Sequence, residues 1–298
     1  MKATVRCPGS CGELVQGTVH GINFLVTCPV TVYSCVSVNL SDICDHASLQ
    51  VQGKTRQAVN RTLRWLSLPL EKVRIQVDSE LPLGKGMASS SADISAACLA
   101  TALAAGREID LDSICNIALE IEPTDGIFLP GITMIDHVSG KIRRGLGHPP
   151  AIQLAIFDVG GEVDTIDFNQ RSDLAALNRA KEPQVKKALQ LVEEGLRQGD
   201  CSLVGAGATL SALSNQSILF KPSLEGIMEL SQSYGAVGVN VAHSGTVIGV
   251  MFMPSADPAL IGECVEEICR EFREIRFFRT ARLTSGGLSV VEAPEYVD

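Results

Sequence analysis

The chain has 298 residues, of which 45% are hydrophobic and 20% charged, an ordinary globular balance with material for one large domain or two smaller ones. Its 25 basic and 34 acidic side chains give a formal net charge of −9. This balance argues against a nucleic-acid binder, which needs clustered Lys and Arg to neutralise phosphates, and against adhesion to an anionic membrane surface. We therefore expect a soluble, acidic α/β-type protein.

The ten cysteines predict no disulfide framework, because the chain is long and its first residues lack the apolar segment of a signal peptide. They include no CxxC pair, and the five histidines show no metal-ligand spacing. The longest apolar stretch, 236–253, is interrupted by Asn240, His243 and Ser244 and makes a poor membrane span. We expect reduced core thiols in a cytoplasmic protein without a membrane anchor.

The first half of the chain reads as strands followed by alternating helices and strands, from β-branched runs and from apolar residues at helical spacing. The predicted strands are 3–6, 22–27, 31–39, 73–77 and 131–138. The predicted helices are 55–66, 89–105 and 112–121. The strand 131–138 is expected to pair with the residues that follow a turn at Ser139-Gly140.

Glycine, histidine and two prolines interrupt the pattern at 145–150, which predicts a boundary between a domain of residues 1–148 and one of residues 149–298. Beyond it the expected strands are 152–157, 236–241, 246–252 and 288–292, and the expected helices are 173–198, 202–213, 223–234 and 257–272. Strands and helices mix in both halves, so the predicted fold is α+β with two lobes.

The segment 79–92 (SELPLGKGMASSSA) carries the clearest chemical signal. It places a strand, then glycines, then Ser89, Ser90 and Ser91 at the opening of a helix. Backbone N–H groups at a helix start favour an anion, and glycine lets a phosphate approach the backbone. The alternative is an ordinary helix with a serine N-cap, and the residues alone leave both open.

A second segment, Gly53-Lys54-Thr55, ends like the nucleotide-binding P-loop GxxxxGK[ST]. Ser48 stands where that motif needs its first glycine, and the residues before it are too polar for a buried strand. We interpret 53–55 as a turn before the helix that carries Trp65.

Three carboxylates occur in 118–126 (ALEIEPTDG), where a helix breaks into a loop. Phosphoryl transfer needs a carboxylate to hold a metal ion and a group that positions or deprotonates the acceptor hydroxyl. Asp125 suits the second role, and Glu120 or Glu122 suits the first. A solvated acidic helix end is the alternative.

The third segment, 234–246, is rich in small residues and contains His243 and Ser244. It fits the wall of a ligand pocket, but a β-hairpin whose turn carries His243 and Ser244 explains the residues as well. A serine hydrolase is disfavoured, because no G-x-S-x-G motif surrounds Ser244.

Taken in order, the three segments resemble the GHMP kinase superfamily. Its central motif, P-x-x-x-G-L-G-S-S-A, stands here from Pro82 to Ser91 with Met, Ala and Ser replacing Leu, Gly and Ala. The residues 7–14 (CPGSCGEL) resemble its N-terminal motif, and 235–249 a degraded C-terminal one. The resemblance implies an N-terminal α+β lobe with a phosphate loop and a C-terminal ferredoxin-like lobe, with the active site between them.

Four stretches together resemble the L-threonine kinase branch of this superfamily: 7–17 (CPGSCGELVQG), 86–93 (GMASSSAD), 122–125 (EPTD) and 242–246 (AHSGT). That resemblance implies an ATP-dependent kinase that converts L-threonine to L-threonine O-3-phosphate for cobalamin biosynthesis, with ATP and Mg²⁺. A kinase of homoserine or another small alcohol, and a nucleotide-binding homologue without turnover, are the alternatives. The residues leave a homodimer open.

The resemblance also implies roles for individual residues. Asp125 accepts the proton of the acceptor hydroxyl, Ser90 and either Glu120 or Glu122 hold the metal ion, with Glu120 preferred, and Gly12 and Glu13 shape the substrate side. Members of the family often carry a lysine in the N-terminal motif, where Ser10 or a neighbour stands here, and Lys85 is expected to compensate for its charge. The residues assigned to the ATP phosphates are Pro82, Gly84, Lys85, Gly86, Met87, Ala88, Ser89, Ser90 and Ser91.

Overall fold

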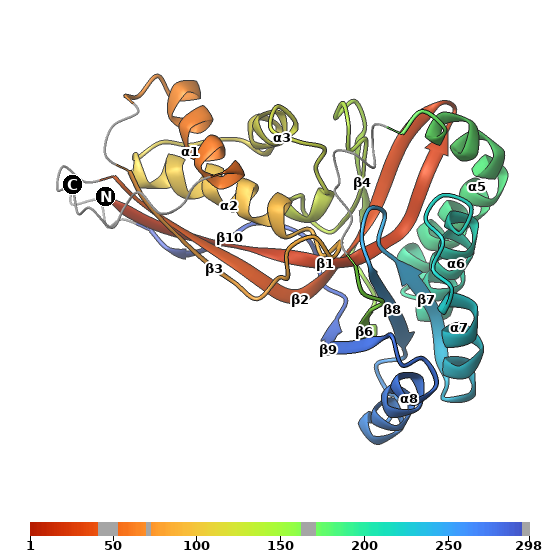
Figure 1. Cartoon of the computed structure of the whole chain (residues 1–298). Coiled ribbons are helices and arrows are strands. Elements are labelled where there is room, and N and C mark those ends of the chain that lie inside the picture. The colour runs from red at the N-terminus through yellow and green to blue at the C-terminus, as the bar shows by residue number, and fades with distance from the viewer. Residues whose placement is uncertain (41–52, 70–72, 162–170, 294–298) are drawn as a thin grey trace.

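The computed structural model describes residues 1–40, 53–69, 73–161 and 171–293. These form two lobes that share one antiparallel sheet, ordered β5-β4-β2-β1-β7-β8-β6-β9, with β10 on β1 and β3 on β2 (Figure 1). The strands are β1 (Lys2–Val19), β2 (Ile22–Leu40), β3 (Val73–Ser79), β4 (Ile132–Ile135), β5 (Arg143–Gly147), β6 (Gln153–Asp158), β7 (Ala236–Val241), β8 (Val247–Phe252), β9 (Arg276–Arg282) and β10 (Ser289–Glu292). The helices are α1 (Lys54–Trp65), α2 (Ser89–Ala104), α3 (Leu111–Leu119), the 3₁₀ turn η2 (Gly126–Phe128), α5 (Leu174–Gln198), α6 (Cys201–Asn215), α7 (Leu224–Ser233) and α8 (Pro258–Glu271).

The helices and most strands lie where the sequence predicts them, but the beginning of the chain differs. Two long strands, β1 and β2, replace the three short ones, because Pro29, which pairs with Ser10, does not divide β2, and Pro8 and Gly9 do not end β1. The pairing of β1 with β2 shifts register between these two residues and again between Ser10 and Glu13. Such β-bulges absorb residues that regular pairing cannot accommodate, so the hairpin stays continuous.

The first lobe packs α2 against β1 and β2, and α1 against α2 (Figure 1). Helix α2 is buried on nearly every side, and small residues such as Ala92, Ala96 and Ala100 allow the close approach. A helix without a polar face belongs in a protein interior. Its first turn is thereby held rigidly against the middle of β1.

The second lobe is ferredoxin-like. Its chain order is a strand, helices, two strands, a helix and a strand, and its sheet order is β7-β8-β6-β9, which is the split β-α-β arrangement. Helices α5 and α6 also contact β1, and β1 joins β7 through the pair Glu13 and Val241. The sheet therefore runs from one lobe into the other without a break.

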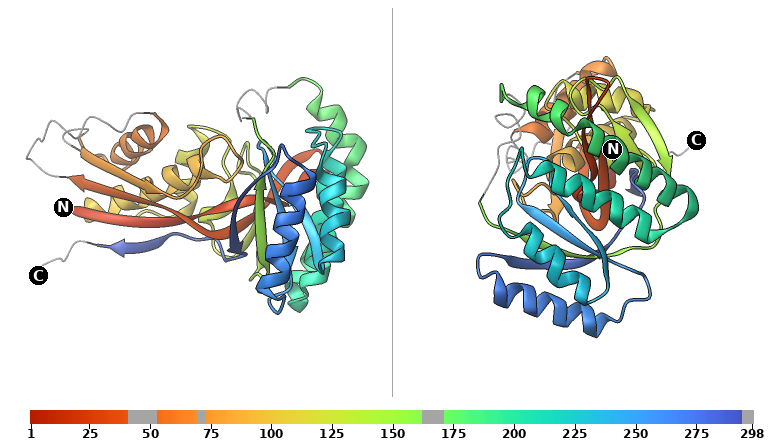
Figure 2. Two further views of the ribbon diagram at one scale, coloured as in Figure 1. Left: turned by 60° about the horizontal axis from the view of Figure 1, so that its bottom comes forward. Right: turned by 90° about the vertical axis from the view of Figure 1, so that its right-hand side faces the viewer.

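The domain boundary expected at residue 148 stays a prediction. It falls between β5 and β6, while β10 returns to pair with the start of β1. The start of β1 and the strand β10 consequently lie at the same end of the molecule (Figure 2).

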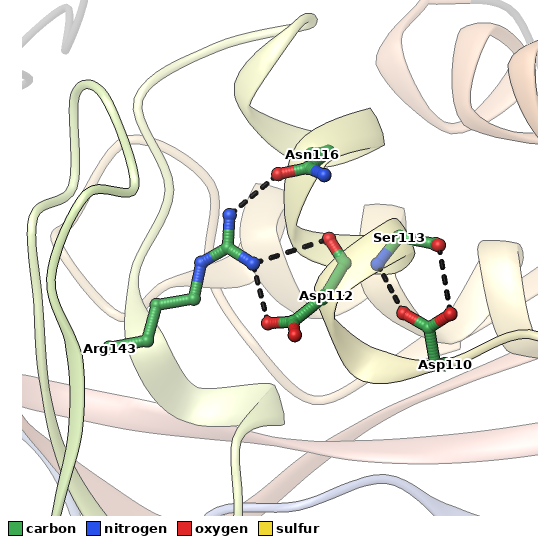
Figure 3. A network of polar contacts seen from close by, with 5 residues as sticks. All are labelled: Asp110, Asp112, Ser113, Asn116 and Arg143. Carbon is green, nitrogen blue, oxygen red and sulfur yellow. Dashed lines mark hydrogen bonds and ion pairs between the residues drawn. The ribbon is translucent and has the colours of Figure 1, made fainter.

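Helix α3 is fixed at its start and along its side (Figure 3). Asp110 caps the helix by accepting the Ser113 backbone N–H at 2.7 Å, and Arg143 of β5 donates to the Asp112 carboxylate and the Asn116 amide oxygen, each at 2.6 Å. These contacts hold the helix that leads directly into residues 120–125.

The cysteines match the expectation of reduced thiols. All nine in the described residues are free, and seven of them are buried; Cys44 lies outside the described residues. None of the helices found there is both long enough and apolar enough to cross a bilayer.

Candidate active site

A cavity of about 440 Å³ opens where the two lobes meet. Its wall comes from the start of α1, the loop before α2, the first turns of α2, the segment after α3, β1, β2 and the turn between β7 and β8. The residues that line it include Glu13, Lys54, Thr55, Gly84, Gly86, Met87, Ala88, Ser89, Ser90, Ser91, Asp93, Glu122, Asp125, His137, His243 and Ser244.

The loop before α2 has the backbone shape of an anion cradle. Gly84, Gly86 and Ala88 all have positive φ, at 71°, 81° and 56°. The residue that caps α2 is Ala88, with no side-chain cap hydrogen bond, so the expected alternative of a serine N-cap is wrong. The first N–H groups of α2 lack intrahelical acceptors and carry the positive end of the helix dipole, which suits bound phosphate.

The turn between β7 and β8 locks this loop in place. The backbone N–H groups of Thr246 and Val247 donate to the Lys85 carbonyl oxygen at 2.9 and 3.1 Å. A Cβ atom at Gly245 would lie 2.4 Å from the Cα of Gly86, so neither position has room for a side chain. The hairpin interpretation of 234–246 is confirmed, and its turn also forms part of the cavity wall.

Lys85 itself points away from the cavity. Its Nζ atom lies 3.0 Å from Asp158 Oδ2 and donates to the Gly161 carbonyl at 2.7 Å. Thr246 donates to the other oxygen of Asp158 at 2.6 Å. Lys85 therefore ties the loop to the end of β6, and its placement does not compensate for the lysine missing near Ser10.

Of the two glutamates considered for a metal ion, only Glu122 lies in the cavity. Its carboxylate is 3% exposed and binds both the Ser90 hydroxyl and the Lys54 ammonium. The carboxylate of Glu120 is 60% exposed and pairs with Arg61 outside the cavity. The chain turns between them after α3 ends, which separates the two side chains.

Asp125 lies at the inner end of the cavity, beside α2. The Ser91 hydroxyl donates to its Oδ2 atom at 3.2 Å and accepts its backbone N–H at 3.1 Å. Burial, together with the nearby Glu122 charge, raises the pKa of Asp125 to about 6, against the lowering effect of the Ser91 hydrogen bond. The group is thus poised to exchange a proton near neutral pH.

Glu13 faces the same end of the cavity from β1. It is 4% exposed, and burial and the neighbouring Asp125 raise its pKa well above the usual range. Its Oε2 atom has no hydrogen-bond partner among the described residues. Gly12 is not in the lining: with φ of 56° it brings β1 so close to β7 that a Cβ would lie 2.4 Å from the Val241 carbonyl.

Two histidines complete the inner wall, and sequence reasoning did not assign either of them to a site. The rings of His137 and His243 meet edge to face with centroids 5.0 Å apart, and Nδ1 of His243 lies 2.9 Å from Gln16 Oε1. Burial keeps the pKa of His243 well below its usual value. Both rings also border a second cavity of about 590 Å³. No local signal marks His137, because its partner lies over a hundred residues away.

The structure thus brings together most of the residues expected from the sequence. Those that line the cavity are Glu13, Gly84, Gly86, Met87, Ala88, Ser89, Ser90, Ser91, Glu122 and Asp125. Those placed outside its lining are Gly12, Pro82, Lys85 and Glu120. Lys54 and Thr55, interpreted from the sequence as a turn, lie inside it and open α1.

The donor set fits a magnesium ion bound together with a nucleotide. Ser90 and Glu122 offer a hydroxyl and a carboxylate oxygen side by side at the start of α2. Magnesium keeps most of its ligands as water and substrate phosphates, and needs only one or two from the protein. Across the described ranges no three His, Cys, Asp or Glu side chains gather as a metal cluster.

Comparison with known families gives two matches that together cover most of the chain. Residues 53–129 match the GHMP kinases N terminal domain, and residues 169–273 match the GHMP kinases C terminal domain. Two characterised relatives are L-threonine kinases. That of Citrobacter freundii is 34% identical over 84% of this chain and 86% of its own length, and that of Salmonella typhimurium is 34% identical over 84% and 82%.

Solved structures share the fold at low identity. A homoserine kinase from Cytophaga hutchinsonii superposes with a TM-score of 0.71 at 16% identity, covering 97% of both chains. A mevalonate kinase from L. major gives 0.68 at 14% identity over 96% of this chain and 97% of its own. At such identities the likeness concerns the fold alone.

Proposed function

The chain belongs to the GHMP kinase family and is an ATP-dependent kinase, and from this premise we propose that it phosphorylates the side-chain hydroxyl of L-threonine. The product is L-threonine O-3-phosphate, and the reaction serves cobalamin biosynthesis in the cytoplasm. The acceptor assignment rests on the 34% identity to two L-threonine kinases across most of both chains. L-Homoserine is the second candidate acceptor. The fold shared with a homoserine kinase, at 16% identity, does not favour it over L-threonine.

The observation that carries the phosphoryl-transfer chemistry is the half-buried Asp125 beside the first turn of α2. The loop with Gly84, Gly86 and Ala88 would cradle the ATP phosphates against the α2 N-terminus. Asp125, linked to that turn through Ser91, would sit next to the transferred group. Phosphoryl transfer depends mainly on such positioning and on electrostatic stabilisation.

Ser90 and Glu122 would hold the magnesium ion. Glu120 is not part of this set, because its carboxylate is exposed and paired with Arg61. When bound, the ion neutralises charge on the phosphates. The protein residues around it keep the Ser90 hydroxyl and the Glu122 carboxylate oriented toward the loop.

In the proposed reaction the acceptor oxygen attacks the γ-phosphorus. The bond between that phosphorus and the β,γ-bridging oxygen breaks, ADP leaves, and the hydroxyl proton passes to the Asp125 carboxylate. Burial raises the pKa of Asp125 to about 6, so the group is ionised at neutral pH and still basic enough to take the proton.

The acceptor would occupy the inner end of the cavity, between Asp125, Glu13 and the two histidines. Glu13 presents a buried carboxyl oxygen without a partner among the described residues, which suits a polar group of an amino acid. Gly12 would act indirectly, since it lets β1 approach β7 and so positions Glu13.

The test is a comparison of acceptors with the purified protein and Mg-ATP: L-threonine, D-threonine, L-serine, L-homoserine and mevalonate. The proposal predicts that kcat/KM for L-threonine exceeds that for each of the others by at least about tenfold, or 1.4 kcal/mol. A preference for L-homoserine would retain the chemistry and refute the acceptor. ATP binding without transfer to any of them would refute the proposal and leave either a different acceptor or a non-catalytic homologue.

A further inference from the structure

The segment Gly53-Lys54-Thr55 has no part in the proposed phosphoryl transfer as described above. Helix α1 begins at Lys54, and both Lys54 and Thr55 line the cavity. The segment forms no P-loop, since the phosphate cradle is built by the loop before α2. Its lysine nevertheless reaches the same cavity from the other side.

The charges in the cavity are strongly unbalanced. Four acidic side chains line it: Glu13, whose raised pKa favours its neutral form, and Asp93, Glu122 and Asp125. Among the described residues around the cavity, Lys54 is the one lysine or arginine, because Lys85 is engaged with Asp158. A nucleotide triphosphate entering this acidic surrounding needs a cation near its terminal phosphate, where negative charge is concentrated during transfer.

Lys54 lies where that cation is needed. Its ammonium binds one oxygen of the Glu122 carboxylate, while the Ser90 hydroxyl donates to the other. The Glu122 carboxylate therefore lies between the Lys54 ammonium and the first turn of α2. The Glu122 side chain is 3% exposed, whereas that of Lys54 is 43% exposed, so the long lysine side chain has room to move from Glu122 to a bound phosphate.

We propose that Lys54 is a catalytic residue whose ammonium binds a non-bridging oxygen of the γ-phosphoryl group during transfer. It supplies the positive charge that Lys85 was expected to provide. The inference rests on the proposed phosphoryl transfer, whose bonds and proton it leaves unchanged: Lys54 stays protonated, Asp125 takes the acceptor proton, and ADP leaves. Its role is to neutralise negative charge on the γ-phosphoryl group during transfer.

The first test is steady-state kinetics of Lys54→Met, with Lys54→Arg and Lys2→Met alongside. Loss of one such donor lowers kcat by about 10²-fold to 10³-fold, which is the result we expect for Lys54→Met. Lys54→Arg keeps the charge and should retain more activity than Lys54→Met. Lys2→Met is the matched control, because it also breaks a lysine–glutamate pair, with Glu292 at the exposed start of β1, and should stay within twofold of the parent.

The second test is calorimetric binding of ATP and of ADP, which needs no acceptor. A contact with the γ-phosphoryl group predicts that Lys54→Met weakens ATP binding at least about fivefold more than ADP binding. A lysine that merely holds Glu122 would weaken both nucleotides alike. Equal losses, or a kcat for Lys54→Met within threefold of the parent, overturn the inference. Failure of the acceptor assignment would instead show in the parent protein, which would leave L-threonine unphosphorylated while still binding ATP.

Discussion

At the scale of single residues, the half-buried Asp125 serves the proposed reaction at a cost to stability. Its pKa of about 6 in the folded protein lies above the ordinary aspartate value. A raised folded pKa contributes stability that is present below about pH 4 and is lost as the pH rises through 6. At neutral pH the protein therefore holds Asp125 ionised in a site that favours its neutral form. The ionised carboxylate is the form that the proposed reaction requires.

Asp125→Asn should consequently lower kcat at least 10³-fold and yet stabilise the protein. The amide cannot ionise, so the free energy of unfolding should rise by up to about 3 kcal/mol above pH 6, because the site no longer has to hold a carboxylate whose pKa it raises to about 6. The gain should vanish at pH 4. Thermal unfolding across this pH range, together with kinetics, checks both parts.

Asp110→Asn is the matched control, for which the expected change in the free energy of unfolding has the opposite sign. The Ser113 hydrogen bonds hold the pKa of Asp110 below its usual value, so its contribution is present at neutral pH and is lost as the pH falls. This variant should be destabilised at pH 7 and keep its activity. A stabilised Asp110→Asn, or an Asp125→Asn without a pH-dependent gain, would contradict the electrostatic account.

Glu13 offers a second prediction at this scale. Burial and the neighbouring Asp125 keep its pKa well above the usual range, which favours the protonated side chain beside an ionised Asp125. Glutamine has the shape of a protonated glutamate. Glu13→Gln should therefore keep kcat within about threefold, whereas Glu13→Ala should raise the KM of the acceptor at least about tenfold by removing a buried polar contact. Equal effects of the two substitutions would refute a protonated Glu13.

At the scale of elements, the phosphate loop carries strain at one position. Ala88 caps α2 with φ of 56°, a conformation that costs a non-glycine residue about 1–2 kcal/mol. Ala88→Gly should raise the free energy of unfolding by about 1 kcal/mol in denaturant titrations. Ala92→Gly, one turn into the same helix, should lower it by about 1 kcal/mol, and a loss of stability in both variants would contradict a strained cap at Ala88.

The loop is also tied to the second lobe through one shared partner. Lys85 and Thr246 bind the two oxygens of Asp158. Lys85→Met and Thr246→Val should each raise the KM for ATP several-fold, since the loop loses part of its anchor. Their effects should be less than additive in the double variant, because both act through Asp158. Strictly additive effects in a kinetic double-mutant cycle would argue against a common anchor.

The elements that the sequence predicts correctly are those with a strong local signal. The helices with apolar spacing and the hairpin of β7 and β8 lie where they are expected. The predicted lengths of β1 and β2 were wrong, because Pro8, Gly9 and Pro29 look like strand ends, and only the paired structure shows that both strands continue through them. Strand β9 escaped prediction because most of its residues are exposed and three are arginines, so it lacks an apolar alternation.

In the candidate site, too, some residues can be predicted from their own segment, and others depend on contacts with distant parts of the chain. The phosphate loop and Asp125 lie in short segments whose residue types are informative by themselves. The choice of Glu122 over Glu120 depends on where α3 ends and on the partners Ser90 and Lys54, which lie over thirty residues away. His137 and Lys54 reach the cavity only through tertiary packing, so sequence spacing could not identify them.

At the scale of the whole molecule, the site depends on a sheet that crosses both lobes. The long hairpin of β1 and β2 starts in the first lobe, and β1 then pairs with β7 of the second (Figure 1). The larger hydrophobic core likewise includes residues of α2 and of α5 and α6. The two lobes that border the cavity therefore share a sheet and a hydrophobic core. This common framework fixes the positions of the phosphate loop, the carboxylates and the histidines relative to one another.

The most direct test of this account is to identify the product by ³¹P NMR after incubation with Mg-ATP and L-threonine, for the parent and for Asp125→Asn. The account predicts the resonance of L-threonine O-3-phosphate together with ADP from the parent, and at least a 10³-fold slower appearance from Asp125→Asn. ADP with free phosphate and no phosphothreonine, or phosphothreonine formed equally fast by both proteins, would contradict it.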